Sequence, residues 1–174
     1  MLHTRVSKVL TLALTAALLA AGVLGAQERP GDKGETPAEK KLRGRSAAPK
    51  AGEIDSGVTL DAMLSKKDKS ALSEEKGATV EGYVVQVERE EDGDYHVALA
   101  PSARESDTKK WVIVEVTPAW QKKSAALSGE ALRKLHGKKV KVTGWLYYEP
   151  DDDQEDPRGT RWEIHPVTEI QAVP

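Results

Sequence analysis

Four residues of the types that bind metals or move protons lie on the polar faces of predicted strands. They are His96, Glu115, Glu163 and His165. Two imidazoles and a carboxylate suit a zinc ion or a general acid–base pair. However, the chain has no His-x-His or His-Glu-x-x-His spacing, which favours a hydrogen-bonded surface network in which carboxylates orient the imidazoles. From this pattern we therefore predict no metal site, no catalytic site and no cofactor.

The two longest strand patterns lie near the end of the chain, over residues 139–148 and 161–170. In both, apolar residues recur at every second position, which is typical of a strand buried on one face. Trp162 and Ile164 are the inward positions of the last strand. Its alternation changes phase at Pro166, which predicts a bulge or an edge because proline cannot donate a ladder hydrogen bond.

Three further strands are predicted upstream. The stretch ATVEGYVVQVEREEDGDYHVALAP indicates strands over residues 78–90 and 95–100, joined at residues 91–94 by a tight Asp-Gly turn. Gly82 marks a bend in the first of them, as a strand needs when it serves both sides of a small barrel. The third strand lies in KWVIVEVTP, residues 110–118, and Pro118 ends it.

Two short helices complete the pattern. Thr59 is a candidate N-cap for a helix whose apolar stripe includes Leu60 and Met63. Between the third and fourth strands, Ser128 can cap a second short helix that stops at Gly137. The element order is therefore a short helix, three strands, a helix and two strands.

The first 26 residues, MLHTRVSKVLTLALTAALLAAGVLGA, have the pattern of a secretory signal peptide. Arg5 and Lys8 precede an apolar run that ends in small residues. A retained membrane anchor is the alternative, because the run approaches the roughly 18 residues that span a bilayer. The small-residue end favours cleavage after Ala26, so we expect a secreted or periplasmic protein with no stable membrane anchor. With no cysteine in the chain, its fold depends on its core and not on disulfides.

Residues 27–57 are predicted to be a disordered linker, and residues 58–174 to be one domain. The linker is rich in Gly, Pro, Ala, Lys and Glu and has almost no large apolar side chains. Such a segment cannot bury enough surface to offset the entropy lost on ordering. Its basic residues are interspersed with acidic ones, which favours a solvated tether over an anion-binding segment.

The charge of the chain disfavours nucleic acid as a partner. The formal net charge is −2, and loss of residues 1–26, with two cations and no anions, would make it −4. Nonspecific nucleic-acid binding requires the opposite sign, because it neutralises phosphates. The run of residues 149–156 is strongly acidic but lacks the alternating ligands and central glycine of an EF-hand loop, so it is interpreted as a solvated loop.

This element order, with a glycine bend in the first strand and GKKVKVTG opening the fourth, resembles the OB-fold. The motifs GATVEGYVVQV, VIVEVTP, VTGWL and WEIHPVTEI, spread over roughly residues 59–172, are similar to those of small exported bacterial OB-fold-like proteins of uncharacterised function. The resemblance implies an all-β domain with minor helix, a five-stranded Greek-key barrel. In such a barrel the second, third and fifth strands are neighbours, so His96, Glu115 and His165 are expected to approach one another.

Three aromatic residues, Trp111, Trp145 and Tyr147, fall on the same strand faces as the histidines and carboxylates. An OB-fold usually binds ligands on this face, where aromatic rings stack on sugars or bases. The alternative is packing at the edges of the core, because the chain has no phenylalanine and Trp and Tyr must supply all aromatic packing.

Together these patterns predict a monomeric, extracytoplasmic OB-fold binding or interaction module whose partner is a small molecule, a saccharide or a protein. The alternative is a histidine- and carboxylate-based metal-dependent hydrolase or nuclease-like enzyme on the same barrel. The candidate ligand-binding residues are Trp111, Glu115, Trp145, Tyr147, Glu163, His165 and His96.

Overall fold

The computed structural model describes residues 36–66, 68–149 and 158–174. The predicted signal peptide, the first part of the predicted linker and nearly all of the acidic loop lie outside the described residues. Within the described residues, no helix is long and apolar enough to cross a membrane.

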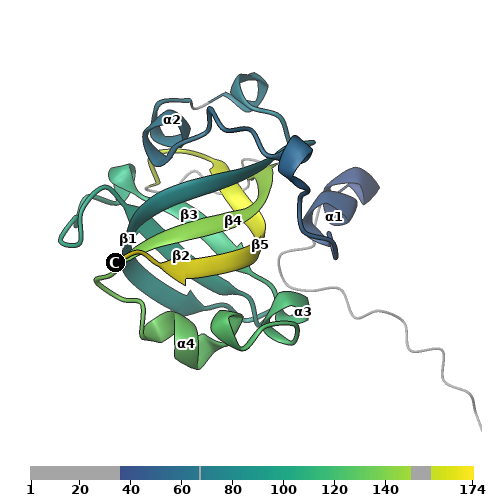
Figure 1. Ribbon diagram of the computed structural model, residues 1–174. Helices are drawn as coiled ribbons and strands as arrows, with labels where there is room; N and C mark the ends of the chain where they lie inside the picture. The colour runs from purple at the N-terminus through teal and green to yellow at the C-terminus, as the bar shows by residue number, and fades with distance from the viewer. Residues whose placement is uncertain (1–35, 67, 150–157) are drawn as a thin grey trace, which may run out of the picture.

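Five strands form a closed barrel in the order β1-β2-β3-β5-β4. The strands are β1 (Gly77–Arg89), β2 (Tyr95–Ala100), β3 (Val112–Val116), β4 (Lys139–Tyr148) and β5 (Trp162–Ala172). All neighbouring pairs are antiparallel except β3 and β5, which run parallel. This order, with a helix between β3 and β4, confirms the predicted OB-fold barrel (Figure 1).

The long strand β1 bends so that it serves two neighbours. Its first half, to Tyr83, pairs with β4, and its second half pairs with β2. Gly82 lies at the changeover, where a Cβ atom would stand 3.2 Å from Leu99 Cβ and 3.3 Å from Leu60 Cδ2. The bend predicted at Gly82 is confirmed, and the close packing there leaves little room for a side chain.

The Asp-Gly hairpin between β1 and β2 is also confirmed. Gly93 has a φ of 93°, a conformation that favours glycine, and its N–H donates to the Glu90 carbonyl at 3.0 Å. The Asp94 N–H donates to Asp92 Oδ1 at 3.0 Å. The turn thereby fixes Asp94 at the entrance to β2.

Short helices close the two ends of the barrel (Figure 1). Helix α2 (Leu60–Ser65) lies at one end, with Met63 fully buried, and α3 (Pro118–Gln121) and α4 (Gly129–Arg133) lie at the other. Both predicted N-caps are confirmed, because Thr59 and Ser128 side chains accept from backbone N–H groups. The remaining helices are α1 (Pro37–Arg43) and the single 3-10 turns Ala51–Glu53, Lys69–Ala71, Thr108–Lys110 and Ala125–Leu127.

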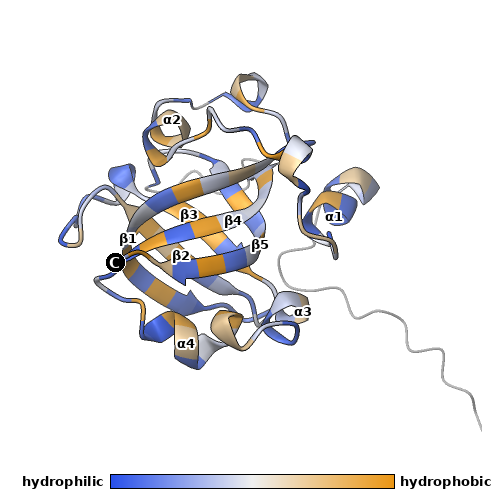
Figure 2. Ribbon diagram, in the orientation of Figure 1, coloured by the Kyte–Doolittle hydropathy of each residue, from blue (hydrophilic) through white to orange (hydrophobic). Residues whose placement is uncertain are grey.

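The barrel interior holds the apolar faces of all five strands. Orange and blue alternate along the strands in Figure 2, as a period of two requires. Trp162 and Ile164 are both fully buried in this core, as predicted. The bulge predicted at Pro166 is present as well: Gly144 pairs with Val167, the next pair is Leu146 with Ile164, and the register shifts between them.

The linker prediction is wrong for the described residues 36–57, because part of this segment contacts the barrel. Trp120 Nε1 donates to the Arg45 carbonyl at 3.0 Å, and Trp145 Nε1 donates to the Ala47 carbonyl at 2.8 Å. The Arg45 guanidinium lies 4.3 Å from the centre of the Trp145 ring and donates to the Glu74 carbonyl. The amino-acid composition did not predict this association, because the segment is held by hydrogen bonds to its backbone and by a cation–π contact. It does not depend on large apolar side chains.

Candidate ligand-binding site

The fold brings together three of the residues singled out in the sequence. His96 on β2 and Glu115 on β3 are direct partners in the antiparallel ladder. On the other side of β3, Val114 pairs with Ile164 of β5, which places Glu115 next to His165. The expected approach of His96, Glu115 and His165 is therefore confirmed, and the parallel β3–β5 pairing is what completes it.

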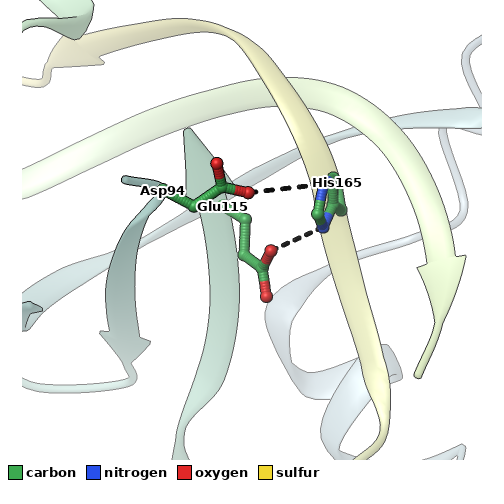
Figure 3. Close-up of side chains that lie close together, drawn as sticks. All are labelled: Asp94, Glu115 and His165. Atoms are coloured by element: carbon green, nitrogen blue, oxygen red, sulfur yellow. Dashed lines mark ion pairs between the residues drawn. The ribbon is translucent and has the colours of Figure 1, made fainter. Parts of the chain in front are cut away.

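Glu115 lies between the imidazoles of His165 and His96 and contacts both of them. Its Oε2 lies 2.6 Å from His165 Nδ1, and its Oε1 lies 3.0 Å from His96 Nε2. The other ring nitrogen of His165, Nε2, lies 4.0 Å from Asp94 Oδ2. Figure 3 shows His165 with one nitrogen directed at each carboxylate. We call Asp94, Glu115 and His165 the central triad.

The cluster is buried, which corrects the prediction of a surface network. Glu115, Glu163 and His165 are 3%, 1% and 1% exposed, whereas the side chain of His96 is 34% exposed. Arg43, at the end of α1, lies 3.9 Å from Glu115 on this face of the sheet. His96 is thus the member of this group that faces solvent.

Glu163 and Glu149 add carboxyl groups on the β5 side of the cluster. Burial and the neighbouring charge of Glu115 raise the pKa of Glu163 well above its ordinary value, although Arg158 contacts one of its oxygens. Burial also raises the pKa of Glu149, against the opposing charge of Arg43. The protonated forms of Glu149 and Glu163 are therefore favoured relative to those of exposed glutamates.

The two imidazoles have the opposite effect on Glu115. Burial alone would raise the pKa of Glu115, but the charge and contacts of His165, followed by those of His96, hold it well below its ordinary value. For His96, burial lowers the pKa, but the hydrogen bond and charge of Glu115 and the charge of Glu90 outweigh burial and raise it. The ionised form of Glu115 is therefore favoured.

Two acidic residues and two arginines of the site, Asp94, Glu149, Arg43 and Arg158, are not among the ligand-binding candidates predicted from the sequence. Asp94 lies two positions before His96, so the period of two would have placed it on the same face. Arg43 comes from α1, and Arg158 comes from the end of the segment between β4 and β5. No local pattern marks these two arginines, because their partners lie in other segments of the chain.

The three aromatic candidates do not form one stacking surface. Trp111 lies at the entrance to β3, where its Nε1 donates to the Glu105 carbonyl at 3.3 Å. Trp145 is partly buried, with the Arg45 guanidinium over its ring and its Nε1 donating to the Ala47 carbonyl. Tyr147 is fully buried, with its ring 5.7 Å from that of His165. The packing alternative holds for Trp145 and Tyr147, and the polar cluster is what distinguishes this face.

The geometry also predicts how stability depends on pH in protein freed of metal by a chelator. The charged groups that face His96 are Glu115, Glu90 and, less favourably, Arg158. A histidine whose pKa is raised by folding stabilises the fold fully below its unfolded pKa, and that stabilisation is lost as pH rises through the folded value. The stability lost in His96→Gln is therefore expected to be larger at about pH 5.5 than at about pH 8.5.

Urea denaturation at the two pH values measures this difference. The control is His136→Gln, because the His136 imidazole contacts the Val85 carbonyl rather than a carboxylate. A loss for His96→Gln that increased with pH would contradict the assigned ion pairs.

The fold and the cluster define an OB-fold domain with a buried histidine–carboxylate site on the outer face of β2, β3 and β5. The donor set can bind a cation, and the ionised Glu115 can stabilise the protonated imidazole of His96. No protein-family model and no curated protein matches the chain.

Several solved structures are similar to parts of the chain. An asparaginyl-tRNA synthetase of Entamoeba histolytica has 15% identity and a TM-score of 0.40, over 59% of this chain and 21% of the synthetase. The Stn1–Ten1 complex of S. pombe has 11% identity and a TM-score of 0.37, over 56% of this chain and 57% of that one. The OBody AM3L09, solved bound to hen egg-white lysozyme, has 16% identity and a TM-score of 0.40, over 56% and 81%. The chain thus spans about a fifth of the length of the synthetase, and its own strand order defines the fold.

Proposed function

We propose that this protein is an extracytoplasmic OB-fold binding module that takes a small, positively charged ligand at the histidine–carboxylate cluster. The observation that supports it most directly is the excess of carboxyl groups there. Asp94, Glu115, Glu149 and Glu163 lie in or beside the cluster, and two arginines, Arg43 and Arg158, interact with these carboxyl groups. A cation would relieve the repulsion between these buried acids.

The position of the cluster also supports a binding role. The hairpin turn between β1 and β2 supplies Asp94, and the two ends of the β4–β5 connection supply Glu149 and Arg158. These are the loops with which OB-folds bind their ligands. The proposed export of the protein is based on the signal-peptide pattern of residues 1–26.

A ligand panel at one ionic strength tests the proposal. NMR spectra of the purified protein are recorded with spermidine, a short lysine peptide, a neutral oligosaccharide and a DNA oligonucleotide. We expect the cationic compounds to shift the amide signals of His96 and Glu115. Glu115→Gln removes a negative charge from the cluster and is expected to weaken that binding by about tenfold, equivalent to about 1.4 kcal/mol.

The matched control is Tyr83→Ala, which alters a separate cavity of about 600 Å³ over β1 and β4. Shifts confined to that cavity, and affected by Tyr83→Ala alone, would contradict the proposed site. Binding of the oligonucleotide at His96 would contradict the proposal of a positively charged ligand and would indicate nucleic acid as the partner.

A further inference from the structure

The central triad offers one nitrogen and two oxygen donors from three separate segments. Asp94 comes from the hairpin turn, Glu115 from β3 and His165 from β5. One ligand atom of each residue lies within 4.8 Å of the others, which is close to the span of two zinc–ligand bonds of about 2.0–2.2 Å. All three residues are buried, at 0%, 3% and 1% exposure.

A second observation concerns the hydrogen bonds around the triad. His165 Nδ1 and Glu115 Oε2 form an ion pair at 2.6 Å, and neither atom has a further hydrogen-bond partner among the described residues. The neighbouring Glu163 is 1% exposed, and its Oε2 also has no hydrogen-bond partner in the part of the chain that the structure describes. Buried polar atoms are normally paired, so the unpaired Glu163 Oε2 beside this single ion pair indicates that the cluster lacks a ligand.

We propose that the central triad of Asp94, Glu115 and His165 is a site for a divalent transition-metal ion, with zinc as the best match. This inference rests on the proposed function and names the class of its cationic ligand. Sequence spacing argued against a metal because the donors are far apart along the chain, but the β2-β3-β5 order brings them together. The strand order therefore brings together donors that a short His-x-His or His-Glu-x-x-His motif would otherwise supply.

The donor set selects among metals. An imidazole suits zinc and similar ions, whereas calcium takes six to eight oxygen ligands and magnesium retains several waters. The chain has no cysteine, so nitrogen and oxygen are the main donors available for the ion. Glu163 lies beside the triad and is placed to supply a further oxygen or to orient a ligand. His96 contacts Glu115 of the triad, and its side chain is 34% exposed.

Calorimetric titration of EDTA-treated protein with zinc tests the site. We expect one equivalent to bind, and Asp94→Asn, Glu115→Gln and His165→Gln each to weaken binding by about 100-fold or more, since even outer-shell partners typically cost about 10- to 100-fold. His136→Gln is the matched control, because its imidazole lies outside the cluster. Calcium and magnesium are expected to bind at least about tenfold more weakly than zinc.

A readout on the unaltered protein avoids dependence on variants that fail to fold. Zinc is expected to shift the imidazole nitrogen signals of His165 and to leave those of His136 in place. The inference is overturned if the protein binds no zinc, if His165→Gln retains full affinity, or if binding is lost in His96→Gln but kept in His165→Gln. The last result would place the ion at the exposed His96–Glu90 pair. If zinc does not bind while the cationic panel members still shift His96, the metal site fails and the binding module stands.

Discussion

Replacement of Glu115 by alanine is expected to lower the free energy of unfolding by about 3–5 kcal/mol in metal-free protein near neutral pH, the range for removal of one partner from a buried ion pair. Glu115 is 3% exposed and contacts His165 at 2.6 Å and His96 at 3.0 Å. Its pKa is held well below the ordinary value despite burial, so its favourable contacts outweigh the cost of burying the charge. Urea denaturation with EDTA present measures the change.

A second effect of the same substitution acts in the opposite direction. The charge of Glu115 helps to raise the pKa of Glu163, so Glu115→Ala should lower the pKa of Glu163, as carbon NMR of its carboxyl can show. This relief offsets part of the loss, which is therefore expected near the lower end of the range. Glu81→Ala is the control, because Glu81 pairs with Lys139 at 2.8 Å on the surface. Its denaturation midpoint should be unchanged, and equal losses in both variants would refute the central position of Glu115.

Trp162→Ala is expected to cost about 3–5 kcal/mol for a different reason, the cavity left by a large core side chain. Trp162 is fully buried, its ring lies 5.3 Å from that of Tyr148, and its Nε1 donates to the Asp68 carbonyl at 3.1 Å. The substitution removes both the packing and the hydrogen bond to the Asp68 carbonyl. Thermal or urea denaturation measures the loss.

Trp111→Ala provides a comparison with the same change of residue. Trp111 is only partly buried and lies at the entrance to β3, so its truncation should cost clearly less than that of Trp162. Similar losses at the two positions would mean that the inner and outer faces of the barrel have been assigned incorrectly.

The sequence alone was sufficient for most of the barrel. The period-two alternation around Ile164, the Asp-Gly turn before β2, the bend at Gly82 and the caps at Thr59 and Ser128 were all predicted and are confirmed. These features share a physical cause: each depends on backbone conformation or on the spacing of neighbours along the chain. Such local preferences can be recognised without knowing which segment lies opposite.

Only the tertiary structure decided what covers the outer face of β3 and β5. Alternation predicted that Glu115 and His165 would face away from the core, and they do, but α1 and the loops beside the barrel bury them. Arg43 reaches Glu115 from 72 positions earlier in the chain, and no period or turn signal connects residues at that distance. Burial shifts the pKa values of Glu115 and Glu163, because desolvation and neighbouring charges act strongly only where water is excluded.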